Sequence, residues 1–239
     1  MAVDPIEKKP LYHYNKGSEI FSVGMAGCNL SCPFCQNWQI SQEFNTKRGK
    51  IMSPKELIET AFSSMPNQKI KSIAYTYSEP LIHIEYILEC MREAHEYGLK
   101  NVLVSNGSVN TAAAEEILKY TDAANIDLKC FREETYNKIL GGSLALAGVK
   151  KFIELALEKN VHLELTTLVV PGMNDSEDEL DDCINYVASL EKGGRMVPWH
   201  LSAYHPAYKY NAPRTDPSFL RKIAAKAGEK IGHVYIGNI

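Results

Sequence analysis

Three cysteines lie within eight residues near the N-terminus, and their spacing suggests a metal centre. Three residues separate Cys28 from Cys32, and two separate Cys32 from Cys35. Three thiolates on one short loop can converge on a single metal centre. A structural zinc site needs four ligands, and no fourth Cys or His lies nearby at the usual spacing. A cubane iron–sulfur cluster held by only three cysteines instead leaves one iron open to a substrate or cofactor.

The three cysteines could also form a zinc knuckle completed by a distant His, or they could be three unrelated buried thiols. The remaining cysteines are scattered: Cys90 and Cys183 fall on apolar helical stripes, where packing explains them. Cys130 lies just past Lys129, and we do not expect it to be a ligand. The charged, proline-broken N-terminus does not resemble a signal peptide, so we expect reduced thiols and a cytoplasmic location.

Polar side chains sit at or near the carboxyl ends of the expected strands at four places in the chain: Glu79, Asn106, Asp127 with Lys129, and His200. Because ligands gather at the carboxyl ends of parallel strands, we expect these residues to share one site. Strand alternation places Asp127 and Lys129 on one face. Two opposite charges that point into a barrel are costly unless they bind each other or a ligand.

Short apolar runs alternate along the chain with longer helical patterns. Ser53 with Glu56, and Ser176 with Glu179, have the spacing of capping boxes that begin helices, and Gly98 is a natural helix end. The expected strands cover residues 20–25, 70–77, 101–105, 124–128, 161–170, 197–203 and 234–236.

The alternation of strands and helices implies βαβ units and a parallel sheet. Six or so units in 239 residues suit a partial (β/α)6 TIM-like barrel better than a complete one, which typically needs about 250 residues. We expect a single α/β domain over residues 1–239, with residues 1–18 as an N-terminal extension and 19–239 as the partial barrel.

The composition indicates a globular protein and gives no sign of nucleic-acid or membrane binding. Hydrophobic residues make up 45% of the chain and charged residues 23%, which excludes disorder, collagen and coiled coil. The 26 basic and 29 acidic residues give a net charge of −3, so broad electrostatic attraction to polyanions is not expected. No apolar run approaches the roughly 18 residues of a membrane span.

The cysteine motif, with the aromatic Phe34 just before its third cysteine, resembles the signature of radical S-adenosylmethionine (radical SAM) enzymes. Within that superfamily the chain resembles the glycyl-radical-activating branch and is similar to pyruvate formate-lyase activating enzyme. It is most similar to the AmmeMemoRadiSam-system radical SAM subgroup, in the Cys-Gln-Asn-Trp stretch at 35–38 and in the opening segment 4–10. The resemblance covers almost the whole chain, in order.

The resemblance implies a [4Fe–4S] cluster on Cys28, Cys32 and Cys35, whose open iron would chelate the amino and carboxylate groups of SAM. Phe34 would then lie near the adenine. An electron from the reduced cluster would split SAM into methionine and a 5′-deoxyadenosyl radical, which abstracts a hydrogen atom from a strong C–H bond. The cofactor carries the hard chemistry, and the protein must position it and exclude water and oxygen.

Two further stretches resemble SAM-binding motifs of the activases. Ser78 and Glu79 match the end of a Gly-Gly-Glu stretch that receives the methionine ammonium, although Ser78 replaces a glycine. Ser105 and Asn106 match an Asp-Thr-Asn-Gly stretch that lines SAM, but Val104 replaces the Asp that helps to hold a monovalent cation. Both stretches could also be ordinary turns after strands.

Two more positions match the activases at later strands. Asp127 and Lys129 match an Asp-Leu-Lys stretch whose charged residues face the SAM site, and the alternative is a structural salt bridge. His200 matches a strand-end His near SAM, and the alternative is a hydrogen-bonded histidine of the core.

The leading functional hypothesis is a radical SAM enzyme that abstracts a hydrogen atom from a glycine of a partner protein, in the manner of glycyl-radical enzyme activases. A second hypothesis is radical modification of another protein or of a small molecule. A third is a non-catalytic metal-binding or electron-transfer module, which would not need the polar residues at the strand ends. The first two imply an external one-electron reductant such as flavodoxin or ferredoxin.

Overall fold

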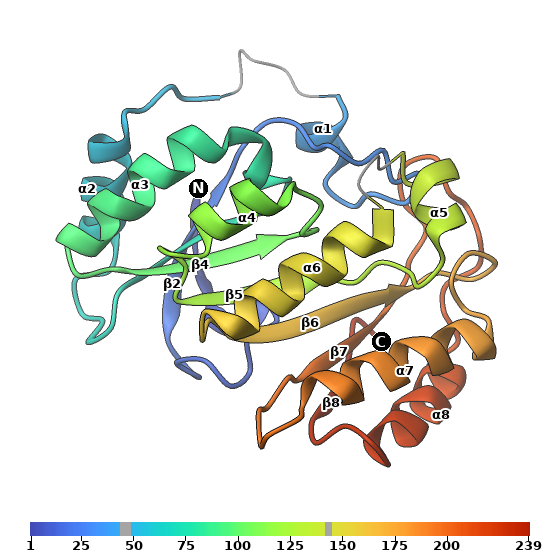
Figure 1. The fold of residues 1–239 in the computed structure, drawn as a ribbon. Helices are drawn as coiled ribbons and strands as arrows, with labels where there is room; N and C mark the ends of the chain where they lie inside the picture. The colour runs from blue at the N-terminus through green and yellow to red at the C-terminus, as the bar shows by residue number, and fades with distance from the viewer. Residues whose placement is uncertain (44–48, 142–144) are drawn as a thin grey trace.

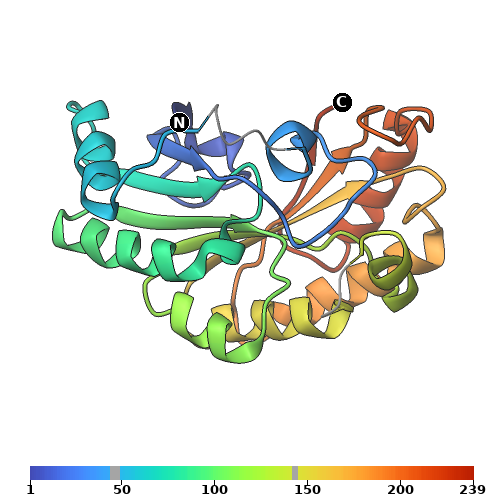
Figure 2. The same ribbon diagram turned by 90° about the horizontal axis from the view of Figure 1, so that it is seen from above.

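The architecture is a curved eight-stranded sheet covered on its outer face by helices (Figures 1 and 2). The computed structural model describes residues 1–43, 49–141 and 145–239. The strands are β1 (Ala2–Pro5), β2 (Glu19–Gly24), β3 (Ser72–Thr76), β4 (Lys100–Ser105), β5 (Ala123–Asp127), β6 (His162–Val169), β7 (Trp199–Ala203) and β8 (Val234–Gly237). The helices are η1 (Ile6–Lys8), α1 (Trp38–Ser41), α2 (Pro54–Ser64), η3 (Pro80–His83), α3 (Ile84–Glu96), α4 (Thr111–Ile117), α5 (Glu133–Lys138), α6 (Ala145–Glu158), α7 (Glu177–Leu190) and α8 (Pro217–Gly228).

The strand order in space equals the order in the chain, from β1 to β8. Every pair from β2–β3 to β7–β8 is parallel, and only β1 runs antiparallel to its neighbour β2. Because each parallel connection crosses over the outer face, the helices form a layer around the sheet (Figure 2). The sheet does not close on itself, so the predicted partial barrel is confirmed.

Local sequence signals set the start of α2 and the end of α3 as expected. Ser53 and Glu56 form the complete capping box of α2, and Gly98 follows α3 with a φ of +72°. The expected box at α7 is only half formed: the Ser176 hydroxyl accepts from Glu179 N, but the Glu179 carboxylate binds Phe131 N at 2.6 Å. A side chain that could cap its own helix instead ties α7 to the turn after β5.

Residues 1–18, expected as an extension, contribute a strand and part of the core. β1 adds to the edge of β2 in the register Val3 with Phe21. Ile6 and Leu11 are fully buried in a small cluster with Ile20, on the side of the sheet away from most helices.

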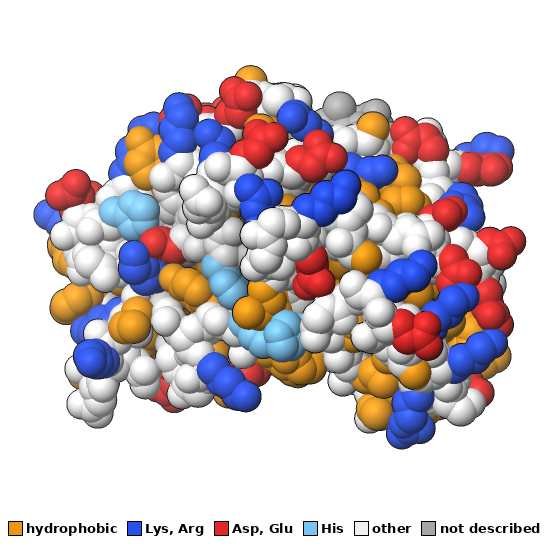
Figure 3. Space-filling model, turned by 60° about the horizontal axis from the view of Figure 1, so that its bottom comes forward, with side chains coloured by type: hydrophobic (Ala, Val, Ile, Leu, Met, Phe, Trp, Pro, Cys, Tyr) orange, Lys and Arg blue, Asp and Glu red, His pale blue; other side chains and the backbone are white. Residues whose placement is uncertain are grey.

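Among the described residues, no helix combines the length and apolarity needed to cross a membrane. On the face drawn in Figure 3, acidic and basic side chains are interspersed, in keeping with the nearly balanced composition.

A buried carboxylate fastens the N-terminal segment across the amino-terminal end of the barrel. Glu164 of β6 has no exposed surface, and it accepts hydrogen bonds from Tyr12 N (3.0 Å), His13 N (2.8 Å), His162 Nε2 (3.0 Å) and His200 Nε2 (2.7 Å). Burial raises the pKa of Glu164, but these four donors outweigh it and lower the pKa to about 2. The carboxylate therefore stays ionised and holds two backbone amides that no regular element satisfies.

Replacing this carboxylate should loosen the N-terminal segment. In Glu164→Gln one acceptor oxygen is replaced by an amide NH2 group, which is itself a donor, so buried donors lose their acceptor, at a cost of about 1–3 kcal/mol. In a chain of this size, each kcal/mol lowers the melting temperature by about 2–4 °C. Thermal unfolding followed by circular dichroism measures the loss, and hydrogen exchange at Tyr12 and His13 should become faster.

The pH dependence of stability distinguishes the loss of the ionised Glu164 carboxylate from an unspecific destabilisation by the substitution. The folded pKa of Glu164 lies below its unfolded value of 4.5, so its stabilisation is present above pH 4.5 and is lost as the pH falls towards 2. The difference between parent and variant should therefore shrink over that interval. The exposed Glu115→Gln is the matched control and should unfold like the parent; equal melting temperatures for both variants would contradict the role given to Glu164.

Candidate active site

A cavity of about 420 Å³ lies at the carboxyl ends of the parallel strands. The loop after β2 and the ends of β3, β4 and β5 supply most of its walls, and β6, β7 and the N-terminal segment complete them. Ten of the residues expected from the sequence line this cavity: Cys28, Cys32, Phe34, Cys35, Ser78, Glu79, Ser105, Asn106, Asp127 and Lys129. Strands that are distant in the chain therefore deliver their polar ends to one place, as the parallel topology requires.

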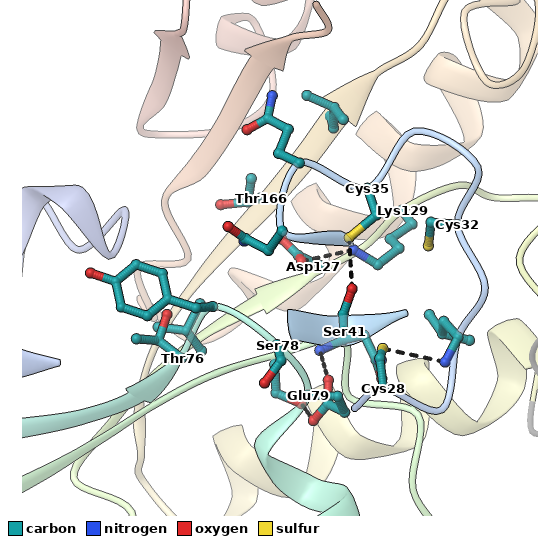
Figure 4. Close-up of a pocket in the computed structure, with 18 of the residues that line it drawn as sticks. Cys28, Cys32, Cys35, Ser41, Thr76, Ser78, Glu79, Asp127, Lys129 and Thr166 are labelled. Atoms are coloured by element: carbon teal, nitrogen blue, oxygen red, sulfur yellow. Dashed lines mark hydrogen bonds and ion pairs between the residues drawn. The ribbon is translucent and has the colours of Figure 1, made fainter. Parts of the chain in front are cut away.

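The three cysteines sit on one loop that curves around the cavity (Figure 4). The loop is fastened on three sides, by Gly27 N to Ile40 O (2.8 Å), Ser31 N to Leu140 O (2.7 Å) and Lys209 N to Pro33 O (2.9 Å). Gly27 has a φ of +97°, and a Cβ there would come within 2.8 Å of Ile82 Cδ1. Only glycine can take this conformation so close to η3, so the start of the loop is fixed by sterics.

Two of the three cysteine sulfurs, those of Cys28 and Cys35, have polar neighbours inside the protein. Cys28 Sγ accepts from Leu30 N at 3.3 Å, and Cys35 Sγ lies 3.1 Å from Ser41 Oγ. Burial raises the pKa of the Cys28 thiol to about 12 and also raises the pKa of Cys32. Binding of a metal centre would displace these protons, since the thiolate is the ligand.

Glu79 joins the ends of β3 and β4 to each other. It is 1% exposed, and its carboxylate accepts from Leu81 N (3.0 Å), Ser105 Oγ (2.7 Å) and Asn106 N (2.9 Å). Burial raises the pKa of Glu79, and the three hydrogen bonds offset part of that effect. Glu79 is therefore part of a network that shapes the cavity wall, and not a simple exposed turn residue. Ser78 lies beside it, with its hydroxyl donating to Met25 O.

Asn106 links that network to the cysteine loop. Its Nδ2 donates to Asn29 Oδ1 at 2.8 Å, and Asn29 Nδ2 donates to Ser108 O at 2.6 Å. The Asn106 side chain also lies 3.8 Å from Cys28 Sγ. Sequence reasoning missed Asn29, because an asparagine between two cysteines has no periodic or motif signal of its own.

Asp127 and Lys129 both line the cavity and form an ion pair, with Lys129 Nζ 2.9 Å from Asp127 Oδ2 (Figure 4). Burial lowers the pKa of Lys129, but the attraction of Asp127 outweighs it, and the net effect is a raised pKa. The Lys129 ammonium therefore stays charged beside the carboxylate. The two side chains satisfy each other, and both remain accessible from the cavity.

His200 does not reach the cavity, and its expected place at a strand end is wrong. It is the second residue of β7, is buried, and binds Glu164 near the opposite end of the barrel. Ser202 lies two residues further along the same face and lines the cavity. Because residues two apart share a face of a strand, His200 and Ser202 lie on the same face of β7, but His200 lies deeper and away from the cavity.

Further residues line the cavity that were not expected to belong to the site. Alternation from Glu164 along β6 points to two of them, Thr166 and Leu168, since residues two apart share a face. Alternation from His200 along β7 likewise points to Ser202, and the others had no local signal. The set includes Lys8, Pro10, Leu30, Ser41, Gln42, Thr76, Tyr77, Thr166, Leu168 and Ser202.

Tyr77 stands out among them because its φ is +70°, an uncommon conformation for a residue with a bulky side chain. Its hydroxyl donates to the Asp4 carboxylate, and Lys9 Nζ lies 4.2 Å from its ring centre and 2.9 Å from Asp4 Oδ2. Lys8 Nζ binds the other Asp4 oxygen at 2.7 Å. Burial raises the pKa of Asp4, but these donors outweigh it and lower the pKa. The N-terminal segment thus supports one wall of the cavity.

Comparison with known proteins identifies relatives over most of the chain. The family model of the Radical SAM superfamily matches residues 22–184. An uncharacterized protein of Methanocaldococcus jannaschii, MJ0808, is 35% identical over all of this chain and 69% of its own length. The pyruvate formate-lyase-activating enzyme of Clostridium pasteurianum is 24% identical over 85% of this chain and 83% of its own length.

Solved structures show a similar fold. Streptococcus suis SuiB bound to S-adenosylmethionine matches 92% of this chain and 50% of its own, with a TM-score of 0.68 and 12% identity. SuiB bound to its precursor peptide SuiA matches 92% of this chain and 49% of its own, with a TM-score of 0.67 and 13% identity. At this identity the likeness concerns the fold alone.

The Glu79 network gives a test that needs no ligand. In Glu79→Gln the side-chain amide NH2 group would face a buried donor in place of an acceptor oxygen, so we expect a loss of about 1–3 kcal/mol in the free energy of unfolding. Denaturant unfolding measures it. Glu89→Gln, on the exposed face of α3, should leave the free energy of unfolding unchanged. If Glu79→Gln is as stable as this control, the carboxylate does not hold the strand ends together.

Proposed function

Because the chain belongs to the radical SAM superfamily, we propose that it uses a [4Fe–4S] cluster and SAM to abstract a hydrogen atom from a glycine of a partner protein. The observation that carries the proposal is the position of the three cysteines. Cys28, Cys32 and Cys35 line the same cavity as a buried carboxylate network and an ion pair from three neighbouring strand ends. One domain over residues 1–239 would hold the whole machinery.

The donor set suits a cluster better than a single metal ion. Among the described residues, no three His, Cys, Asp or Glu side chains converge as a single ion would require. A cubane does not need such convergence, because each thiolate binds a different iron. Cys28, Cys32 and Cys35 would hold the cluster, and Cys90, Cys130 and Cys183 are buried elsewhere. When bound, the cluster and SAM together would supply the 5′-deoxyadenosyl radical that takes the hydrogen atom.

The residues of this chain would bind and orient SAM. SAM carries a carboxylate, an ammonium and a sulfonium, and the Asp127–Lys129 pair offers partners of both signs from one strand end. Glu79, Ser105 and Asn106 would fix the wall beside the cysteine loop, with Ser78 adjacent. Phe34 is buried next to the cysteines, where it could face an adenine ring.

The rest of the cavity wall favours an uncharged substrate group. Among the described lining residues, each charged side chain has a partner: Lys8 binds Asp4, Lys129 binds Asp127, and Glu79 accepts three hydrogen bonds. The remaining wall offers neutral polar groups, which include the hydroxyls of Thr76, Thr166 and Ser202 and the side-chain amides of Gln36, Asn37 and Gln42. Neutral donors and acceptors suit a peptide backbone, whose own groups are also uncharged.

The relatives point in the same direction. The C. pasteurianum relative is named for activating pyruvate formate-lyase, and SuiB is described with a bound precursor peptide. We infer a protein substrate, a one-electron donor such as flavodoxin or ferredoxin, and a cytoplasmic setting that keeps the thiols reduced. Radical modification of another protein or of a small molecule is the alternative, whereas a pure electron-transfer module would not need the paired charges of the cavity.

The source of the abstracted hydrogen tests this proposal directly. Cells are grown on α-deuterated glycine, and their extract is separated by size into a macromolecular and a small-molecule fraction. Reconstituted enzyme, SAM and a reductant are then incubated anaerobically with each fraction. Deuterium should appear in 5′-deoxyadenosine only with the macromolecular fraction. Transfer only from the small-molecule fraction would favour the alternative substrate class. Cys28→Ala should yield no nucleoside, whereas Cys90→Ala, which alters a cysteine of the helical core, should behave like the parent.

The ion pair gives a second test. A hydrogen bond between SAM and a charged side chain of the pair would contribute about 1.5–3 kcal/mol, which is roughly ten- to hundredfold in affinity. Asp127→Asn and Lys129→Met should therefore keep the iron content but weaken SAM binding by that factor, as measured by calorimetry.

The exposed Glu134–Lys138 pair of α5 is the matched control, with both side chains 73% exposed. Glu134→Gln and Lys138→Met should bind SAM like the parent, since exposed pairs contribute little. If Asp127→Asn and Lys129→Met do so as well, the pair is a structural salt bridge and does not hold SAM.

A further inference from the structure

The amide of Asn106 is aimed at the sulfur of Cys28. Asn106 lies directly after β4 and is 4% exposed. Its Nδ2 lies 3.8 Å from Cys28 Sγ, within reach of an N–H···S hydrogen bond, and 2.8 Å from Asn29 Oδ1. The two hydrogens of the amide thus have one oxygen and one sulfur as neighbours.

The orientation of this amide is fixed by its other hydrogen bonds. Asn106 Oδ1 accepts from Ser108 N at 2.7 Å, so the oxygen must face that backbone amide and the nitrogen must face the cysteine loop. Asn106 N is held by Glu79 at 2.9 Å. Asn29 in turn donates to Ser108 O at 2.6 Å. Rotating the amide would break these contacts and place two donors opposite each other.

Cys28 therefore has two nitrogen donors around its sulfur, the Asn106 side chain and Leu30 N at 3.3 Å. The corresponding neighbour of Cys35 is a hydroxyl, Ser41 Oγ. Hydrogen bonds to the sulfurs are one of the means by which a protein sets the reduction potential of an iron–sulfur cluster. A donor stabilises the state with more negative charge, which is the reduced state, so it raises the potential.

We propose that Asn106, oriented by Asn29, raises the reduction potential of the cluster by donating its side-chain amide to the Cys28 thiolate. This inference rests on the proposed function and gives Asn106 a role besides lining the SAM site. The step concerned is the transfer of one electron from the external reductant to the oxidised cluster, with no proton transferred. Asn106 and Asn29 act here as positioning residues, because their effect passes through Cys28.

The test is the midpoint potential of the reconstituted cluster, measured without SAM by redox potentiometry with EPR detection. Asn106→Ala should lower the equilibrium constant for reduction by about tenfold, which is a fall of about 59 mV for one electron. Asn110→Ala removes an asparagine from the same turn, where it caps α4 away from the cysteines, and should leave the potential unchanged. SAM affinity of the oxidised protein is measured in parallel.

Each result then has one meaning. An unchanged potential in Asn106→Ala, with or without weaker SAM binding, overturns the inference. If Asn106→Ala fails to hold the cluster, the potential of Asn29→Ala is measured instead. This variant keeps both Asn106 and Cys28 but removes the residue that orients the amide, so it should lower the potential by a smaller amount. An unchanged potential in Asn29→Ala overturns the inference. If the parent protein binds no cluster, the proposed function itself fails, which iron analysis reveals before any potential is measured.

Discussion

The site depends on one buried carboxylate, Glu79. A carboxylate out of contact with water must find donors inside the protein, and those of Glu79 come from η3 and from the end of β4. The constraint extends beyond the two strands. Asn106, held by Glu79 through its backbone, holds Asn29 through its side chain, and Asn29 belongs to the cysteine loop. The position of the first cysteine is therefore set by hydrogen bonds that begin at a strand end, and not only by the loop that carries it.

At the opposite end of the barrel a second buried carboxylate, Glu164, also collects donors from distant parts of the chain, and there it holds the N-terminal segment in place. Glu164 is as buried as Glu79, but its donors are two backbone amides of the N-terminal segment and two histidines. It fixes a segment that would otherwise have no regular partner, and that segment also brings Lys8, paired with Asp4, to the cavity wall. Glu164 closes the amino-terminal end of the barrel, and Glu79 shapes the cavity at the carboxyl end. Because the two ends use separate carboxylates, a change at the cavity need not disturb the amino-terminal end.

The charges of the cavity are matched within the protein itself. Asp127 and Lys129 neutralise each other, and Lys8 is neutralised by Asp4. Such pairing avoids the cost of an unpaired buried charge. A zwitterionic ligand can replace each partner by one of its own groups without leaving a charge unmatched. The same pairing leaves hydroxyls as the other polar groups that we describe on the β3, β6 and β7 walls.

Much of this protein is determined by the sequence alone, because local patterns report local physics. The cysteine spacing places three thiols on one loop, the strand–helix alternation dictates a parallel partial barrel, and parallel strands must bring Glu79, Asn106 and Asp127 to one edge. What only the tertiary structure decided involves partners far apart in the chain. Strand periodicity predicts the face of His200 but not its depth, so its pairing with Glu164 could not be read from the sequence. Glu179 could have capped α7 but binds Phe131, and Tyr77 takes a left-handed conformation supported by Asp4 and Lys9. Each of these outcomes depends on a donor or acceptor that the fold brings near, because a buried polar group takes the partner available in space and not the nearest one in sequence.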